Sequence, residues 1–493
     1  MTETHDSVIF EKHLLNDVPA TPPFLKKEMV YVIDNNGSSN YSRNQVEFET
    51  LSLSNSGKWA DYSEGFISIP VVVTLTYSVA QVLTAQALES RIRFKQGVPL
   101  IDKVSWSYNN TPMLAERDEY PSFAAFKMNS EMSQDQLKVD GQTMGFHKET
   151  DAWLYDDSLK SDRTLLPRQF YTETGRLGVM TRDIASSCGM DTVEAISDVE
   201  IVYRKDVIVR LKDLPGFEKM SLTRGGSIKL TLKLNQGSAV TTYAANGKVA
   251  STVPALKGSS NPLLIDQEAA AAVVETVSWG VCQDSGYNHE KSQCRLYVPL
   301  YQFTPEAELQ MLKKKESKFT YDDYFFTKVK EQTGSFNVNL TNGIKRARGL
   351  LIVPKIAKSG NKDVTQDESM LYGPPCCPYA MKDFNVQLSG SDIYAQSQQY
   401  KYEHFMNELS GGKLGLNAGV DGVMSGLISK LDYENTHGYL YTDLSRRYDY
   451  DRDVSISISI RGTIQSLKAM DLYCYIIYEK EGVISVSTGE LLS

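Results

Sequence analysis

The sequence predicts an all-β protein made of two jelly-roll β-sandwiches in tandem, with a few short helices in the loops. Short segments rich in β-branched and aromatic residues, bounded by Asn, Ser and Gly, recur along the whole chain. Paired segments also repeat in the same order in the two halves. The 493 residues, 41% hydrophobic and 23% charged, are enough for two or three globular domains.

The first half of the chain reads as a series of short strands. They are expected at 29–34, 46–53, 66–76, 104–108, 199–203, 206–211 and 227–234. The last of them, SIKLTLKL, alternates apolar residues with Lys and Thr, which is typical of a strand with one buried face. We therefore expect an N-terminal arm at 1–28 and a first jelly roll at 29–235. Polar, turn-rich sequence then predicts a linker or exposed loop at 236–275.

The second half resumes the strand pattern and adds two helices. Strands are expected at 294–301, 336–341, 349–356, 384–388, 455–460 and 472–479. Thr304 and Pro305 suit the cap and first position of a helix that ends near Lys313–Lys315. A second helix at 399–409 is followed by two glycines, which favour a helix end. A second jelly roll is therefore predicted at 276–493.

Four pairs of segments link the two halves. LSLSNSGK (51–58) pairs with VNLTNGIK (338–345), 67–71 with 351–355, 104–110 with 384–390, and 126–133 with 405–410. The second pair has a Pro inside an apolar strand, which suits a sheet edge or a bulge. Two copies of one domain with drifting loop lengths would leave such a series. The alternative is chance similarity, because strand and turn sequences use a limited vocabulary.

Charge and cysteine content exclude several classes of protein. The net charge is −9, and residues 1–28 contain no Arg, so the chain lacks the basic arm that neutralises nucleic acid. We expect no direct, sequence-specific nucleic-acid binding. We expect no signal peptide and no membrane span, because no apolar stretch is long enough. Six cysteines in so long a chain do not predict a disulfide framework, and folding in a reducing compartment is expected.

Residues that could carry chemistry are few and poorly spaced. No nucleotide-binding loop, nucleophile elbow or zinc-protease motif is present. Cys282, His289 and Cys294 lack a fourth zinc ligand and a common spacing, which favours two reduced thiols and an exposed His. His404 is interpreted as a packed helix residue. We therefore predict no catalytic, cofactor-binding or metal-binding residues, no cofactor and no enzymatic activity.

Two further clusters leave alternatives open. Asp449, Asp451 and Asp453 resemble the start of a calcium loop, but the central Gly is missing and position 460 is Ile. A solvated acidic turn is favoured, and a weak cation site at a subunit junction is the alternative. The adjacent Cys376 and Cys377 mark a Pro-rich loop, with reactive thiols as the lesser interpretation.

The second half also resembles a known family. CRLYVPLYQFTPEAE, SFNVNLTNGIKRARGLLIVP, YLYTDLSRR and DLYCYIIYEKEGVISVSTGEL are similar to double-jelly-roll, hexon-like major capsid proteins of small eukaryotic DNA viruses. These are the capsid proteins of polinton-like viruses, adintoviruses and virophages. The resemblance covers most of 290–493 and is fainter over 45–110 and 199–235. It implies trimers that act as pseudo-hexamers and tile an icosahedral shell.

The leading hypothesis is therefore a major capsid protein that associates with itself as a homotrimer and capsid lattice. Penton or minor capsid proteins are the further expected partners, and the expected location is the virion, assembled in the host cytoplasm or nucleus. One alternative is a single-jelly-roll capsid or penton protein with a large inserted domain. A carbohydrate-binding β-sandwich is the alternative from another class, although Trp106 lies on an apolar strand position and is expected in the core. A hydrolase using His404 or Asp451 comes last.

Overall fold

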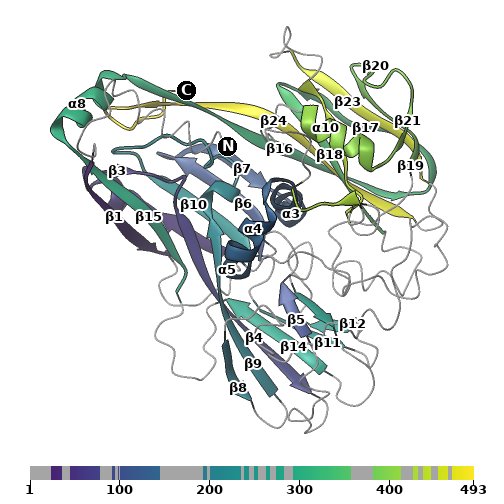
Figure 1. Cartoon of the computed structure of the whole chain (residues 1–493), viewed down its shortest axis with the longest axis horizontal. Helices are drawn as coiled ribbons and strands as arrows, with labels where there is room; N and C mark the ends of the chain where they lie inside the picture. Colours follow the sequence, from purple (N-terminus) through teal and green to yellow (C-terminus); the bar gives the residue numbers. More distant parts are fainter. Residues whose placement is uncertain are drawn as a thin grey trace.

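The computed structural model describes most of the predicted strands, and it shows a mostly β architecture (Figure 1). It describes residues 24–35, 45–77, 91–94, 98, 100–144, 192–196, 200–234, 238–243, 249–253, 263–266, 274–281, 293–356, 381–411, 426–430, 433, 437–445, 454–464 and 469–492. The all-β prediction is confirmed, and the described helices are short.

The C-terminal part of the chain forms one jelly roll. Its strands are β16 (Glu316–Gln332), β17 (Gly334–Ile344), β18 (Ala347–Ile356), β19 (Met381–Leu388), β20 (Ser391–Asp392), β21 (Gln398–Tyr400), β22 (Leu440–Asp443), β23 (Ile456–Ile464) and β24 (Met470–Ser485). One sheet has the order β16-β24-β18-β22, and the other has the order β17-β23-β19-β20. This interleaving of strands from two antiparallel sheets is the jelly-roll pattern.

The N-terminal part repeats the same pattern. Its corresponding strands are β1 (Phe24–Ile33), β2 (Gln45–Glu49), β4 (Phe66–Tyr77), β6 (Ile101–Tyr108), β7 (Thr111–Arg117), β9 (Glu200–Arg210), β10 (Ile228–Leu234) and β15 (Arg295–Phe303). One sheet contains β1, β15, β4 and β9 as successive neighbours, and the other runs β2-β10-β6-β7. With the short strand β21 left out of the numbering, the eight strands of each roll have the sheet orders 1-8-3-6 and 2-7-4-5. The predicted pair of tandem jelly rolls is confirmed by this shared strand order.

Inserted strands lengthen one end of the first roll. They are β3 (Trp59–Ala60), β5 (Arg91–Phe94), β8 (Thr192–Ile196), β11 (Ser238–Tyr243), β12 (Val249–Val253), β13 (Leu263–Asp266) and β14 (Val274–Val281). β15 pairs with the first residues of β4, and β14 pairs with the remainder of β4 from Val71 onward. In Figure 1 the insertions other than β3 lie in the lower lobe of the molecule, whereas β3 lies beside β15 at the upper left.

The domain boundaries stay a prediction, and the strand pairing favours different ones. The expected linker at 236–275 contains β11 and β12, which join the sheet of β4 through β14. β15 follows the predicted boundary at 276, yet it pairs with β1 and β4. These pairings favour a first roll that ends near Phe303, because an eighth strand that returns to the first sheet closes the roll.

The four pairs of similar segments do not all have the same secondary structure. Residues 51–53 were expected to continue a strand, but they form a short helix, α2 (Leu51–Ser54), whereas VNLTNGIK lies largely in β17. The strand prediction for 51–53 is therefore wrong. The two segments still lie at corresponding places, because 51–58 follows β2 and 338–345 contains the end of β17, and these are the second strands of their rolls. The other three pairs occupy matching places: β4 with β18, β6 with β19, and α3 (Tyr120–Glu131) with α10 (Tyr402–Gly411).

The two prolines of the second pair occupy equivalent sites. Pro70 pairs with Asp206 of β9, and it lies between the part of β4 that pairs with β15 and the part that pairs with β14. Pro354 pairs with β24, beyond the four residues of β18 that pair with β22. In both strands the proline lies outside the residues that pair with a neighbour on one side of the strand. Its missing N–H therefore removes no hydrogen bond to that neighbour.

Helices close the ends of the rolls. α8 (Pro305–Lys313) joins the two rolls, and the side chain of Thr304 caps it as predicted. Short turns of helix, α4 (Gln134–Gln136), a π-helical segment (Leu137–Gly141) and α5 (Gln142–Met144), follow α3. A single hydrophobic cluster contains core residues of both rolls, among them Trp106 and Tyr475. The core therefore continues from one roll into the other.

Candidate functional site: the interface between the two jelly rolls

A buried interface joins the two rolls and is the most elaborate polar and aromatic arrangement in the described residues. Figure 1 shows α3 between the rolls, with β16 and β24 running from the second roll over the first. These two strands are 17 and 16 residues long, so they extend beyond the second sandwich. Their extra length supplies the side chains that contact the first roll.

Asp323 of β16 lies at the centre of the polar part of this interface. Its side chain is completely buried, and Arg117 of β7 donates to it from Nε at 2.7 Å and from Nη2 at 2.6 Å. Tyr478 donates its hydroxyl to Oδ2 at 2.8 Å, and Lys480 Nζ lies 2.8 Å from the same oxygen. The backbone N–H of Tyr324 donates to Oδ1. This buried carboxylate is therefore fully satisfied, as a stable buried charge requires.

The charges on both sides hold each other ionised. Burial alone would raise the pKa of Asp323, but Arg117 and Lys480 outweigh it and hold that pKa below its usual value. Burial would likewise lower the pKa of Arg117, and Asp323 reverses the effect. Because Arg117 belongs to the first roll and Asp323 to the second, separating the rolls would leave Arg117 without its carboxylate partner and Asp323 with Lys480 as its remaining cation.

An aromatic layer lies beside this ion cluster. Phe123 of α3 packs on Tyr324 with ring centroids 4.5 Å apart, and on Tyr475 at 5.8 Å. One turn later, Phe126 packs on Tyr439 at 5.2 Å and on Tyr441 at 5.9 Å. The outer face of the β16-β24-β18-β22 sheet is thus covered by one helix of the first roll. Such aromatic pairs add to the free energy gained by burial.

The tyrosine hydroxyls of this layer are tied to the backbone of the first roll. Tyr321 donates to the carbonyl of Met113 at 2.8 Å, Tyr324 to Asp118 at 3.1 Å, and Tyr475 to Glu119 at 2.9 Å. All three acceptors lie in β7 or in the turn that leads into α3. These hydrogen bonds fix the register of β16 and β24 on β7, because each buried hydroxyl needs its partner.

The C-terminal segment also contacts the first roll. Asn109, in the turn after β6, donates to the carbonyl of Gly489 at 2.8 Å. Gly489 has φ +69°, and a Cβ there would lie 2.2 Å from the carbonyl oxygen of Arg224. Val486 packs with Trp59 and Phe303 in a small second hydrophobic cluster. The tail after β24 therefore acts as a further contact between the rolls.

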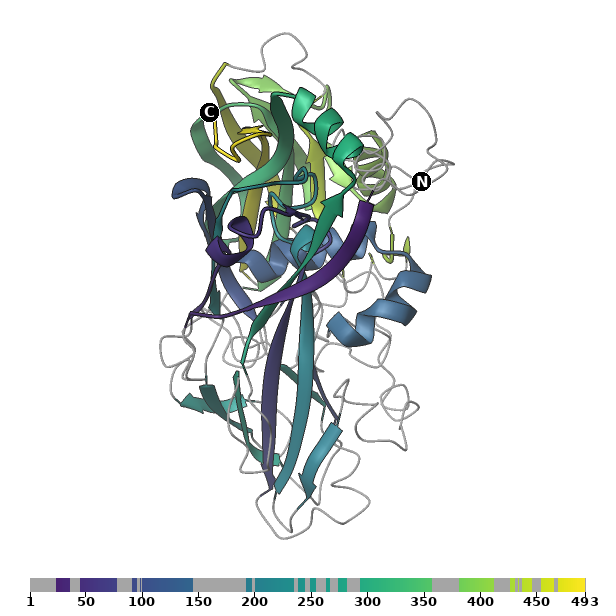
Figure 2. The ribbon, with the colours of Figure 1, turned by 90° about the vertical axis from the view of Figure 1, so that its left-hand side faces the viewer.

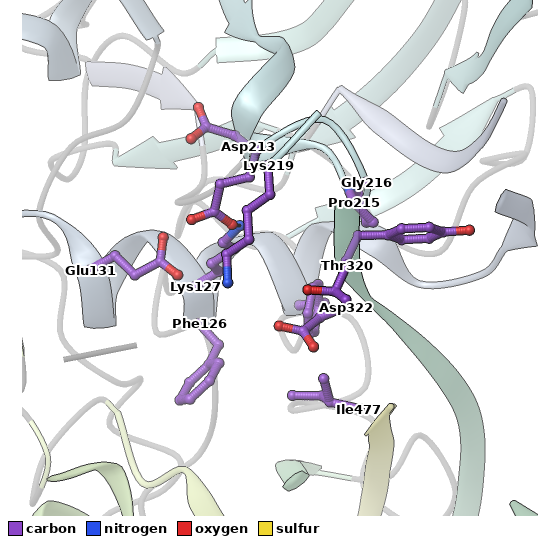
Figure 3. A pocket seen from close by; sticks show the side chains of 13 residues that line it. Phe126, Lys127, Glu131, Asp213, Pro215, Gly216, Lys219, Thr320, Asp322 and Ile477 are labelled. Carbon is purple, nitrogen blue, oxygen red and sulfur yellow. Dashed lines mark hydrogen bonds and ion pairs between the residues drawn. The ribbon is translucent and has the colours of Figure 1, made fainter. Parts of the chain in front are cut away.

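A pocket opens beside the interface, between α3, the turn after β9 and β16 (Figure 3). Its charged lining consists of Lys127, Glu131, Asp213, Glu218, Lys219 and Asp322. Lys127 Nζ lies 3.1 Å from the carboxylate of Glu218. Charge from Lys127 lowers the pKa of Glu218, whereas desolvation raises the pKa of Glu131 to about 8. The pocket therefore holds neighbouring carboxylates with opposite pKa shifts.

Most residues singled out from the sequence lie outside the part of the chain that the structure describes. Asp449, Asp451, Asp453, Cys376, Cys377, Cys282 and His289 lie outside the described residues. Cys294 is buried beside the start of β15. The Nε2 atom of His404 lies 3.0 Å from the side-chain oxygen of Gln398, and its ring packs against Tyr400. His404 is thus a packed helix residue, as interpreted from the sequence.

The structure also bears on the expectations about tryptophan residues, metal sites and membrane spans. Trp106 is buried, as predicted, and its Nε1–H donates to the carbonyl of Pro215 at 2.9 Å. Trp59 is buried as well, so neither ring offers a stacking surface for sugars. Among the described residues, no group of three or more His, Cys, Asp and Glu side chains could hold a metal ion. Across the part of the chain that is described, no helix is long and apolar enough to cross a bilayer.

The sequence interpretation missed the interface almost entirely. β16, ESKFTYDDYFFTKVKEQ, was not recognised as a strand because five Lys and Glu residues and two adjacent Asp residues interrupt its apolar pattern. The available signal was the aromatic spacing, with Phe319 and Tyr321 two residues apart, followed by Tyr324 and Phe326. Nothing in the sequence around Arg117 or Asp323 indicates that these two residues form an ion pair.

Comparison with known proteins agrees with the architecture. No protein-family model matches the chain, and no curated protein matches its sequence. A chain of the Sputnik virophage, in a structure determined by cryo-EM, matches with a TM-score of 0.55 and 12% identity, over 97% of this chain and 89% of that chain. The crystal structure of the mavirus major capsid protein matches with a TM-score of 0.51 and 9% identity, over 94% and 89%.

At this level of identity the comparisons establish the fold. The chain has the double-jelly-roll fold that is found in virophage capsid proteins, and the resemblance predicted from the sequence is confirmed at the level of the fold. The likeness extends over nearly the whole chain, so it includes both rolls and their connection.

Proposed function

We propose that this protein is a viral major capsid protein that associates with itself to form an icosahedral shell. The observation that carries the proposal is the presence of two jelly rolls with one strand order, locked together by the buried interface around Asp323. A subunit with two equivalent, rigidly joined rolls can supply six rolls to a trimer, which gives a block of nearly hexagonal outline. Closed shells are built from such blocks.

The two similar solved structures support this role. One is a structure of the Sputnik virophage, and the other is the mavirus major capsid protein. The net charge of −9 favours a shell protein that leaves neutralisation of the genome to other components. The proposal includes a structural and non-enzymatic role, a location in the virion, and penton or minor capsid proteins as further partners.

The alternatives lose their main support. A single jelly roll with an unrelated insert does not account for a second pair of sheets with the same order. Carbohydrate binding by exposed tryptophans receives no support from Trp59 or Trp106, which are both buried.

Electron microscopy of the purified full-length protein tests the proposal. We expect trimers of hexagonal outline in negative stain, or closed shells at higher protein concentration. Size-exclusion chromatography with light scattering should give three times the mass of the 55.2 kDa chain. A protein that stays monomeric at every concentration, with no particles, would contradict the proposal.

A further inference from the structure

Three exposed apolar residues of the first roll lie on one face of one strand. Met29, Tyr31 and Ile33 of β1 are 50%, 51% and 41% exposed. They lie on the side of β1 that faces away from the core, because the alternate residues Val30 and Val32 pack against the core. Figure 2 shows β1, in purple, crossing the surface of that side of the molecule.

Neighbouring strands extend this apolar surface. Tyr31 pairs with Tyr297 of β15, and Tyr297 pairs with Phe66 of β4, so the three rings form a row across the sheet. The rings of Phe66 and Tyr297 stack with centroids 4.8 Å apart, and those of Tyr31 and Tyr297 lie 5.8 Å apart. We call the surface of Met29, Tyr31, Ile33, Phe66 and Tyr297 the β1 face.

The second roll has an equivalent row on the equivalent strands. Phe326 of β16 pairs with Tyr475 of β24, and Tyr475 pairs with Leu351 of β18. Each row therefore joins the first, eighth and third strands of its roll. The two rows differ in their surroundings: Tyr475 and Leu351 have no exposed surface, because α3 of the first roll covers this sheet.

The covering element also has an equivalent. α3 and α10 both follow the fifth strand of their rolls and precede the sixth. α3 packs against the β16-β24-β18-β22 sheet of the second roll. α10 buries Phe405 and Leu409 in its own roll, whereas Glu403 is exposed and Tyr402 and Met406 are half-buried. We call the surface of Tyr402, Glu403 and Met406 the α10 surface.

We propose that the β1 face of one copy binds the α10 surface of a second copy, so that the contact between the two rolls within the chain is repeated between chains. This inference rests on the proposed function and names the surfaces that join its trimer. The β1 face lies on the left side of Figure 1 and α10 on the right side, with the intramolecular contact between them. A head-to-tail contact of this kind closes into a ring when its rotation permits.

The chemistry of the two surfaces fits this pairing. The guanidinium group of Arg295 lies 5.2 Å from the ring centre of Tyr31, which places a cation on the β1 face. Glu403 places a carboxylate on the α10 surface, where it forms an exposed ion pair with Lys430 at 2.7 Å. An aromatic patch with a cation at its side is typical of the centre of a protein interface. An exposed ion pair contributes little stability, so the Glu403 carboxylate can exchange Lys430 for Arg295 of the second copy.

Tyr31→Glu in the full-length protein tests the β1 face. A carboxylate placed at the centre of an apolar interface should raise the dissociation constant of the trimer by about thirtyfold or more. Light scattering at a concentration where the parent protein is trimeric should then show monomers. Leu309→Glu, on the exposed side of α8, is the matched control and should remain trimeric. Equal thermal midpoints of the monomeric variant and of the parent protein diluted to monomer would show that the variant is folded.

A photo-activated benzoylphenylalanine at position 31 identifies the partner surface. In mixtures of isotopically labelled and unlabelled chains, we expect cross-links between copies that end in 402–411. Cross-links from position 31 to β1 of another copy would overturn the inference, because the contact would then be symmetric. Trimers that persist in the Tyr31→Glu variant would also overturn it, while leaving the proposed function intact. A parent protein that never forms trimers or shells would instead overturn the proposed function.

Discussion

The equivalent outer sheet faces of the two rolls differ in burial. Both carry an aromatic or apolar row across their first, eighth and third strands, Tyr31–Tyr297–Phe66 in one roll and Phe326–Tyr475–Leu351 in the other. The second row is covered by α3, and the first is open at the surface. The difference teaches that strand order sets which residues share a face, whereas the neighbouring roll decides whether that face is buried.

The largest expected effect comes from breaking the ion cluster that joins the rolls. Arg117→Ala would leave Asp323 buried without its bidentate partner, at a cost of about 3–5 kcal/mol in the free energy of unfolding. Chemical denaturation followed by tryptophan fluorescence measures this loss.

The second roll supplies the matched control for this substitution. Arg461 and Asp392 form an ion pair at 2.6 Å, but about a third of each side chain is exposed. Arg461→Ala should therefore cost about 1 kcal/mol or less. Equal losses in the two variants would show that the Arg117 cluster does not lock the rolls together.

Removing the aromatic cover of the second roll should have a somewhat smaller effect. Phe123→Ala deletes the ring that packs on Tyr324 and Tyr475, and we expect a loss of about 3 kcal/mol in the free energy of unfolding. Phe325→Ala removes a ring of the same size that is 40% exposed, so its loss should be about 1 kcal/mol. A negligible effect of Phe123→Ala would mean that α3 does not hold the sheet.

The pocket beside α3 predicts a dependence of stability on pH. The pKa of Glu131 is raised to about 8 by desolvation, with Lys127 and Arg210 opposing the rise and Glu218 and Asp213 adding to it. The folded protein therefore retains a proton that the unfolded chain releases near pH 4.5. Because Glu131 is an exposed residue, screening by solvent keeps the resulting change in stability small. This contribution to stability is complete below about pH 4.5 and is lost as the pH rises toward 8.

Glu131→Gln is the variant that isolates this contribution. Its denaturation midpoint should fall less than that of the parent protein between pH 5 and 8, the window set by the two pKa values. Asp135→Asn, in the first turn of α4 and exposed, is a control with the same change of charge. Parallel pH profiles for the parent protein and Glu131→Gln would contradict the prediction.

The smallest expected effect concerns the two hairpins that the rolls share. Asn109-Asn110 joins β6 to β7 and Ser389-Gly390 joins β19 to β20, and all four residues have positive φ. Such two-residue turns favour Gly and Asn. Gly390→Ala should lower the free energy of unfolding by about 1 kcal/mol, and Asn110→Gly should change it by less.

Denaturation midpoints of the two variants test the equivalence of the hairpins. Nothing lies within 4 Å of a Cβ built at Gly390, so any loss reports backbone strain alone. A Gly390→Ala variant as stable as the parent protein would show that this turn readily adopts another conformation.

Much of the fold could be predicted from residue patterns. The alternation in SIKLTLKL predicted β10 and placed Leu230 and Leu232 on its buried face, where they pair with Trp106 and Val104 of β6. Thr304 and Pro305 predicted the start of α8. Where local signals conflicted, prediction was wrong: LSLS alternates like a strand, yet its leucines form a helical turn and only Leu53 is buried.

The interface and the place of β15 could not be predicted in the same way. Arg117 and Asp323 are 206 positions apart, and each reads alone as an ordinary surface charge. CRLYVPLY was recognised as a strand, but its sequence does not state which sheet it joins. Closure of the first roll by β15 depends on pairing with β1 and β4, which are remote in the chain.

By itself, the sequence determined most of the strands, the start of α8 and the similarity of the two halves, but not β16 or the helical turn at Leu51–Ser54. These properties depend on side-chain periodicity and on backbone preferences that act over a few residues. Only the tertiary structure decided that two similar sheet faces have different surroundings, one beneath α3 and one at the surface. Burial depends on contacts between remote segments, so it belongs to the assembled chain and not to any stretch of it.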